Sequence, residues 1–249
     1  MPAWKEFREK LKWLDPFTYV DLFLMPKINP KNNEVISWAV YLVSAFVFAF
    51  AIYSILGFIL GTGSPMVIVV SGSMEPTMYR GDVIVLQGVA PEQINAPEID
   101  TGLPSLEKVP LSTIAELDSI QRVILFKDGQ SLAFQQIGTG DTVVYNSDIR
   151  AEPIIHRAIA KLLAKDGVYL LTKGDHNTGV DEDCGTVSVN GSSVIVSKQC
   201  INLYPVKADK IQGRAVLKIP LVGYVKLIFF DDLPTLLFGC RNPYGCQFP

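Results

Sequence analysis

The segment SGSMEPTMYRGDVIVL, which begins at Ser71, places two serine hydroxyls on either side of a glycine, directly after a long uncharged stretch. A serine hydroxyl becomes a nucleophile only when a neighbouring base removes its proton. The chain contains two histidines, His156 and His176, as candidates for that base. Serine, glycine and proline also mark ordinary turns. The residue types therefore permit acyl-transfer chemistry at Ser73, and on their own they fit a plain loop at least as well.

Carboxylates gather around the second histidine, in the turn LTKGDHNTGVDED. A carboxylate can hold a histidine in the tautomer that accepts a proton from serine, and Asp175, Asp181 and Asp183 are the candidates. A calcium loop is a poorer interpretation, because its sixth position is Val180 instead of glycine and its flanks have strand patterns. We expect Glu182 and Asp183 to belong to a solvated surface loop.

The composition excludes one class of function. The 249-residue chain has a net charge of -3 and scattered lysines and arginines, whereas a nucleic-acid-binding protein normally has a basic face. The length accommodates one large or two small domains. Hydrophobic residues make up 49% of the chain, which is ordinary, but they are concentrated near the N-terminus. This uneven distribution points to a membrane segment.

The apolar stretch VISWAVYLVSAFVFAFAIYSILGFIL, residues 35–60, is long enough to cross a hydrocarbon core of roughly 30 Å as a helix. No charged residue occurs between Glu34 and Glu75. The alternatives are a cleaved signal peptide, whose apolar region is shorter, or a buried core helix. The glycines and proline of residues 61–65 end the helix. We therefore predict one transmembrane helix.

Positive charges near this helix predict its orientation. Lys27 and Lys31 precede it closely, whereas only Arg80 follows it within twenty residues. Because lysine and arginine are enriched on the cytoplasmic side of a span, the N-terminus is expected in the cytoplasm. The chain after residue 61 then faces the outside or a lumen, where thiols can be oxidised.

Four cysteines are consistent with such a compartment. Cys184 and Cys200 flank a segment containing Asn190-Gly191, a strong hairpin signal, while Cys240 and Cys246 are separated by a short loop. We expect neighbours to pair, although four cysteines permit three connectivities and the sequence does not choose among them. No spacing matches a Cys-x-x-Cys zinc site. Asn190 also begins a glycosylation sequon.

Beyond residue 61 short β-branched and aromatic runs alternate with turn dipeptides, which is typical of a mainly β domain. Further hairpins are expected at Asp128-Gly129 and Asp166-Gly167. The region from residue 87 to about residue 136 resembles an insertion, with a short helix near residues 112–117.

Two apolar segments flank this domain. The upstream segment WKEFREKLKWLDPFTYVDLFLMPKI suits a helix on the membrane surface. The downstream segment that begins at Leu217 is too interrupted by charges and prolines to span a bilayer. It fits either the membrane interface or a core strand over LVGYVKLIFF.

Four segments in succession resemble the four boxes of type I signal peptidases: SGSMEPTMYRGDVIVL, GDTVVYNSDIRAEPIIHRAI, LLTKGDHNTGVDED and GRAVLKIPLVGYVK. The resemblance covers roughly residues 66–230 and is strongest to the archaeal and endoplasmic-reticulum branch. The bacterial branch uses a lysine base where this sequence has His156, so a Ser-Lys dyad is not carried over. The chain departs from the family in its longer 87–136 region and in His176, where asparagine is more usual.

The resemblance implies a role for each matching residue. Ser73 would be the nucleophile, His156 the general base and Asp181 the carboxylate that orients the histidine. Asp175 is also functionally implicated in this branch. Ser71 matches the residue whose hydroxyl helps to bind the oxyanion, beside the backbone N–H of Ser73.

The activity implied is that of a membrane-bound serine endopeptidase, which removes signal peptides from secretory preproteins after a small residue and needs no metal or organic cofactor. It would work on the extracytoplasmic side of the cell membrane or of the endoplasmic-reticulum membrane, and any partner subunits are unknown. The alternative is an inactive membrane-anchored β module that serves as a binding or assembly subunit. The expected divisions are a cytoplasmic segment (1–34), the transmembrane helix (35–60), the catalytic domain (61–230) and a tail (231–249).

Overall fold

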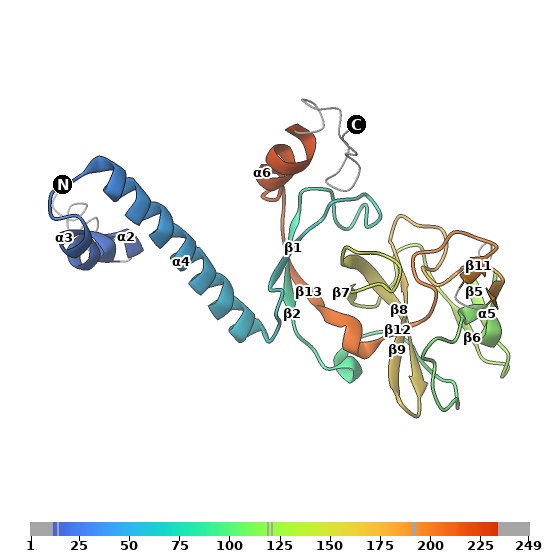
Figure 1. The fold of residues 1–249 in the computed structure, drawn as a ribbon. Coiled ribbons are helices and arrows are strands. Elements are labelled where there is room, and N and C mark those ends of the chain that lie inside the picture. The colour runs from blue at the N-terminus through green and yellow to red at the C-terminus, as the bar shows by residue number, and fades with distance from the viewer. Residues whose placement is uncertain (1–11, 14, 119, 121, 191–192, 234–249) are drawn as a thin grey trace, which may run out of the picture. The chain divides into compact units, whose positions relative to one another are not determined.

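A computed structural model describes residues 12–13, 15–118, 120, 122–190 and 193–233 (Figure 1). The chain divides into two compact units, Met1–Ile59 and Leu60–Pro249. The predicted pair Cys240–Cys246 lies outside the described residues, as does most of the expected tail.

The first unit is dominated by α4 (Glu34–Leu60), whose 27 residues would extend about 40 Å at 1.5 Å per residue. This length exceeds the hydrocarbon core of a bilayer, roughly 30 Å. Trp38 is 76% exposed and Phe58 is 90% exposed, so a buried core helix is excluded. Within the described residues α4 is the one helix long and apolar enough to cross a membrane.

A short helical segment before α4 packs against its first turns. The Tyr41 hydroxyl donates to Asp21 Oδ1 at 2.5 Å, and the Phe17 ring makes edge contacts with Tyr41 and Phe48. Asn33 caps α4, because its side-chain oxygen accepts from the Val35 N–H at 2.9 Å. The described part of the upstream segment is thus helical, and its placement at a membrane surface stays a prediction. Its elements are α2 (Pro16–Tyr19), the π-helix η1 (Val20–Leu24) and α3 (Met25–Ile28).

The second unit is built on an eight-stranded, mainly antiparallel sheet, which confirms the predicted β fold. The strand order is β1-β2-β13-β7-β8-β9-β12, and β3 pairs in parallel with β8. The long strands β8 and β9 form a hairpin that projects from the sheet in Figure 1. The strand bounds are Met66–Ile68 (β1), Val83–Gln87 (β2), Glu98–Asp100 (β3), Thr142–Tyr145 (β7), Ile154–Ala164 (β8), Gly167–Lys173 (β9), Val206–Lys207 (β12) and Ile211–Ile219 (β13).

The segment between β2 and β7 contains a second, three-stranded sheet, β4-β5-β6. Its hydrophobic residues, among them Leu111, Ile124 and Phe126, form one buried cluster with side chains of β8 and β9. The segment is therefore packed onto the main sheet. Its elements are η2 (Pro91–Gln93), α5 (Leu111–Ile114), β4 (Ala115–Asp118), β5 (Val123–Phe126) and β6 (Ser131–Ala133).

The predicted hairpins are present, with small shifts. Asp128-Gly129 lies in the turn between β5 and β6, and Gly129 has a positive φ of 91°, as such a turn requires. The β8–β9 turn lies one residue earlier than expected, because Gly167 already pairs with Ala164. A third hairpin joins β10 (Val187–Asn190) to β11 (Ser193–Val196). The predicted helix at 112–117 ends instead at Ile114, since the following residues pair with β5.

The apolar segment after β13 is helical, so the core-strand interpretation of LVGYVKLIFF is wrong. Leu227 is buried, but Val225 and Phe230 are exposed, because one helical turn can direct only part of such an apolar run inward. Whether the exposed part meets a membrane stays a prediction. The elements here are α6 (Tyr224–Leu227) and the π-helix η4 (Ile228–Asp232), and η3 (Ala208–Lys210) precedes β13.

Candidate active site

Ser73 lies in the turn that joins β1 to β2, where it is partly exposed. Met74 and Met78 anchor this turn, because both are buried in a cluster with Ile84 and Leu86 of β2. Hydrophobic burial on one side of the turn thus leaves the Ser73 hydroxyl at the accessible side.

A continuous line of hydrogen bonds joins three segments that are distant in the sequence. His156, on β8, places Nε2 2.9 Å from Ser73 Oγ. Its other ring nitrogen, Nδ1, lies 2.5 Å from Asp181 Oδ2. His156 and Asp181 are each 2% exposed, so water is largely excluded from their contact. This is the geometry in which a histidine can accept a serine proton while a carboxylate fixes its tautomer.

Asp181 is held in place by hydrogen bonds to its backbone carbonyl and by further donors to Oδ2, the oxygen that contacts His156. Its carbonyl accepts from the N–H groups of Ile201 and Asn202, at 2.9 and 3.0 Å. Oδ2 also accepts from Thr172 Oγ1 at 2.8 Å and from the Tyr145 hydroxyl at 3.2 Å. Burial raises the pKa of Tyr145 well above its ordinary value of 10.0, and the charges of nearby carboxylates add to the effect. The tyrosine therefore stays a proton donor.

The family follows from the comparisons. No protein-family model matches the sequence. The signal peptidase complex catalytic subunit sec11 of Schizosaccharomyces pombe is 31% identical over 186 residues, which cover 75% of this chain and 77% of that protein. The chain belongs to the type I signal peptidases. SEC11 catalytic subunits of Colletotrichum graminicola (27% identical; 85% of this chain, 90% of theirs) and Yarrowia lipolytica (26% identical; 80% of each) extend the match over more of the chain.

Membership in this family decides between the two functions that the sequence left open, an active peptidase and an inactive membrane-anchored β module. The relatives are named catalytic subunits, so the chain is an enzyme, a signal peptidase that removes signal peptides, and the reading as an inactive module is not supported. The β-rich unit described above has the fold expected of this family.

Asp175 does not contact His156. Its two carboxylate oxygens accept from Arg157, at 2.8 Å from Nε and 2.7 Å from Nη2. The Thr77 hydroxyl donates to the same carboxylate at 2.5 Å. The enzyme thus uses Asp175 to tie the end of the Ser73 turn to β8.

The turn that contains Asp175 also contacts Ser73 directly. The His176 N–H donates to the Ser73 carbonyl at 2.9 Å, while the imidazole itself is exposed. A Cβ atom on Gly174 would lie 2.6 Å from the same carbonyl, closer than real Cβ contacts allow. Only glycine permits this approach, and the second histidine contributes through its backbone.

The expectation that Glu182 and Asp183 are solvated is wrong. Glu182 is 2% exposed and accepts from the Thr172 N–H at 3.1 Å and from Asn202 Nδ2 at 3.0 Å. Burial first, and the neighbouring charge of Asp181 second, raise the pKa of Glu182 well above its ordinary value. Asp183 is largely covered and pairs with Lys198. Thr172, Tyr145 and Asn202 were not singled out from the sequence, because only the packed sheet brings them together.

A buried lysine lies close to the site without acting on the serine. Lys173 Nζ donates to the carbonyls of Gln136 and Gly174, at 2.7 and 2.8 Å. Burial lowers the pKa of Lys173 from its ordinary value. The Gln136 side chain donates in turn to the carbonyls of Asp175 and Asn177. The far end of the inserted segment therefore supports the turn behind Ser73.

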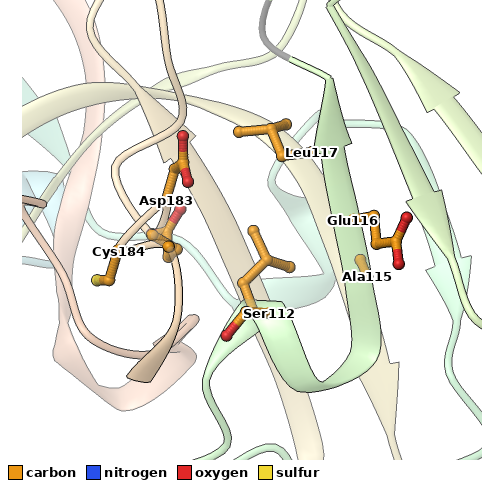
Figure 2. A pocket seen from close by; sticks show the side chains of 9 residues that line it. Ser112, Ala115, Glu116, Leu117, Asp183 and Cys184 are labelled. Atoms are coloured by element: carbon orange, nitrogen blue, oxygen red, sulfur yellow. The ribbon is translucent and has the colours of Figure 1, made fainter. Parts of the chain in front are cut away.

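The same segment and residues 182–185 border a separate, half-open pocket of about 280 Å³. Figure 2 shows Ser112 and Leu117 on one side of it and Asp183 and Cys184 on the other. None of Ser73, His156 and Asp181 lines this cavity, so it is distinct from the place where the serine hydroxyl is accessible. Its lining is Leu111, Ser112, Ala115, Glu116, Leu117, Glu182, Asp183, Cys184 and Gly185.

Proposed function

We propose that Ser73 Oγ attacks the carbonyl carbon of the residue that ends a signal peptide, while His156 Nε2 accepts the hydroxyl proton. The observation that carries this proposal is the hydrogen-bonded line from Ser73 through His156 to Asp181, with spacings of 2.9 and 2.5 Å. Asp181 holds Nδ1 protonated, so that Nε2 is the basic nitrogen. The activity of the family supplies the reaction, and the geometry supports these roles for the three residues.

The reaction proceeds in two halves. Attack forms a tetrahedral intermediate, and its collapse breaks the peptide C–N bond as His156 gives the proton to the leaving amine. The mature protein departs, and the signal peptide remains as an ester on Ser73. His156 then removes a proton from a water molecule, which attacks the ester carbonyl. Collapse of the second intermediate returns the proton to Ser73 Oγ and releases the signal peptide.

Ser71 is assigned to the developing oxyanion. Its hydroxyl lies 3.2 Å from Ser73 Oγ and is exposed, so it can turn towards a carbonyl oxygen bound at the serine. Together with the Ser73 N–H it would stabilise the negative charge of both intermediates. Removing one such donor costs about 10²–10³ in rate in a serine protease where this was measured.

The membrane setting follows from α4 and from the relatives. Lys27 and Lys31 favour a cytoplasmic N-terminus, so the catalytic unit lies on the extracytoplasmic side. Because the relatives are named subunits of a signal peptidase complex, we place this enzyme in such a complex in the endoplasmic-reticulum membrane, acting on secretory preproteins. Small side chains before the cut fit the A-x-A pattern of cleavage sites.

The test is cleavage of a preprotein by the full chain in detergent, as wild type, Ser73→Ala and His156→Ala. Both variants should remain folded by thermal melting and lose cleavage, and changing the small residue before the cut to a large one should abolish cleavage by the wild type. A Ser73→Ala variant that still cleaves at the wild-type rate would show that the nucleophile lies elsewhere.

A further inference from the structure

Two carboxylates that follow one another in the chain both point into the protein beside the same threonine. Thr172 Oγ1 lies 2.8 Å from Asp181 Oδ2 and 3.1 Å from Glu182 Oε1. Thr172 is fully buried, and each acid is 2% exposed. The catalytic role proposed above uses Asp181 and leaves Glu182 without a purpose. A buried carboxyl next to the orienting acid of a proposed triad needs an explanation.

The number of available hydrogen-bond donors limits the protonation states that Asp181 and Glu182 can have. A threonine hydroxyl has one proton to donate, so it cannot satisfy two ionised carboxylates at once. Among the described residues no lysine, arginine or histidine contacts Glu182; its remaining donors are the Thr172 N–H and Asn202 Nδ2. A second buried anion beside Asp181 would therefore lack a compensating positive charge, which is costly in a protein interior. A proton on one of the two acids removes the second buried charge and gives the contact between Glu182 Oε1 and Thr172 Oγ1 a donor, while Asp181 Oδ1 and Asn202 Oδ1 have no hydrogen-bond partner within the described part of the chain.

The other donors identify which acid that is. Asp181 Oδ2 has three partners, namely His156 Nδ1, Thr172 Oγ1 and the Tyr145 hydroxyl. The Tyr145 hydroxyl also lies 2.9 Å from Thr172 Oγ1, so His156 Nδ1 and Thr172 Oγ1 are the two closest donors to Asp181 Oδ2. Donors that converge on a carboxylate favour its ionised form. Glu182 Oε1 accepts from Asn202 Nδ2 at 3.0 Å and also lies 3.1 Å from Thr172 Oγ1. If the Thr172 proton goes to Asp181, a carboxyl O–H of Glu182 can donate to the lone pairs of Thr172 Oγ1.

We propose that Glu182 carries a proton and donates it to Thr172 Oγ1, which donates its own proton to Asp181 Oδ2. Glu182 is thereby a positioning residue: it fixes the direction of the threonine hydroxyl, and the hydroxyl fixes the carboxylate that orients His156. This inference rests on the proposed function, because it assumes that Asp181 orients the base. The raised pKa of Glu182 agrees with it.

The charged and titratable groups around Glu182 come from every neighbouring element. Asp181 and Asp183 belong to its own turn, Tyr145 to β7, His156 to β8 and Lys173 to β9. Asp183 is engaged by Lys198, and Lys173 donates to backbone carbonyls. Tyr145 accepts from Asn202 Nδ2 at 2.9 Å, the same amide that donates to Glu182. Asn202 thus links the tyrosine and the glutamic acid on opposite sides of Thr172.

The experiment measures kcat and KM for preprotein cleavage, and the pH profile, with the full chain in detergent. Glu182→Gln replaces the carboxyl O–H with an amide N–H, so it should keep kcat close to the wild-type value. Glu182→Leu has similar size but no donor, so kcat should fall while KM stays unchanged. We expect a decrease of about 10- to 100-fold, by analogy with the loss of residues that orient metal ligands. Asp183→Asn is the matched control from the same turn and should behave as wild type.

The pH profile separates a neutral Glu182 from an ionised one. If Glu182 is neutral, Glu182→Gln leaves the acid-side midpoint of activity where it is in the wild type. If Glu182 is ionised, its removal takes away a negative charge near His156, and the midpoint should move to lower pH by roughly one unit. That movement, or a folded Glu182→Gln variant with low kcat, would overturn the inference.

Thr172 provides an independent route to the same test, should Glu182→Leu fail to fold. Thr172→Val removes the relay hydroxyl and should lower kcat, whereas Thr172→Ser should restore it. The effects of Thr172→Val and Glu182→Leu should not add in the double variant, because they break one line of bonds. Additive effects, or a fully active Glu182→Leu, would refute the positioning role. An active Ser73→Ala would instead refute the proposed function.

Discussion

At the scale of single residues, two aspartates in one turn make different contacts. Asp181 contacts His156 through a hydrogen bond. Asp175 instead binds Arg157 through both carboxylate oxygens and accepts a hydrogen bond from the Thr77 hydroxyl. Because neighbouring residues of a strand point to opposite faces, His156 and the next residue of β8, Arg157, each require a partner on a different side. The two aspartates are therefore not interchangeable. Replacing one should affect turnover and melting temperature differently from replacing the other.

Asn substitutions should separate these roles. Asp181→Asn should stay folded and lose turnover by orders of magnitude, about 10⁴ where the equivalent change was made in another triad, because the wrong histidine tautomer is favoured. Asp175→Asn should lower the melting temperature as well as activity, since it leaves Arg157 without its charge partner. Asp183→Asn should change little. Turnover and thermal melting of the three variants test the assignment, and a fully active Asp181→Asn would contradict it.

Glu182 should also make stability depend on pH. In the unfolded chain this group ionises near its ordinary value of 4.5, whereas in the folded protein burial and Asp181 raise its pKa well above that. As pH rises above about 4.5, the unfolded state loses the proton first, so the folded state loses stability. Glu182→Gln has no such titration. Its melting temperature relative to wild type should therefore rise as the pH increases above about 4.5, and a constant difference would count against a buried, protonated glutamic acid.

The sequence could predict part of this site. Ser73, His156 and Asp181 stand in segments whose residue types resemble a family, and those three residues do meet in the structure. Glu182 was misjudged because an acidic turn with a glycine has the composition of a solvated loop. Its burial depends on β9 and on Asn202, which is twenty residues away in the sequence. The local sequence around Glu182 therefore cannot predict this packing.

At the scale of elements, a disulfide and backbone hydrogen bonds link the turn that contains Asp181 to the residues that follow the β10–β11 hairpin. The predicted bridge between Cys184 and Cys200 is present, with a sequence separation of 16 residues. The next two residues, Ile201 and Asn202, donate their N–H groups to the Asp181 carbonyl. The bridge therefore lies beside the backbone contacts that hold Asp181.

Removing the bridge should affect both stability and activity. For a loop of about 15 residues the chain-entropy model gives roughly 3 kcal/mol. A Cys184→Ala/Cys200→Ala double variant should melt at lower temperature and cleave preprotein more slowly, because residues 200–202 can move away from Asp181. Denaturant unfolding and kcat, compared with the oxidised wild type, provide the measurement. Unchanged stability together with unchanged kcat would show that the packing suffices without the bridge.

The order of strands was beyond what the sequence could predict. Turn dipeptides located the hairpins to within a residue, since glycine at positive φ is a local requirement. The pairing of β13 between β2 and β7 joins residues more than sixty positions apart, and the hydrophobic alternation of these short strands is compatible with many partners.

At the scale of the whole molecule, the two units differ in how they bury apolar side chains. Those of α4 are exposed along its length, whereas the second unit buries hydrophobic clusters and also exposes apolar side chains such as Val225 and Phe230 after β13. The expected topology places residues before α4 in the cytoplasm. In sealed vesicles with the cytoplasmic side outward, added protease should remove an N-terminal tag and leave the β-rich unit intact. A protected tag with a digested β-rich unit would reverse the orientation.

Because Gly174 approaches the Ser73 carbonyl so closely, no space for a further atom is left between the turn that contains Asp175 and Asp181 and the turn that contains Ser73. A methyl group added at residue 174 would push the two turns apart, although we assign residue 174 no chemical role. A transplant of either turn into another scaffold would consequently fail unless both were moved as a single matched pair.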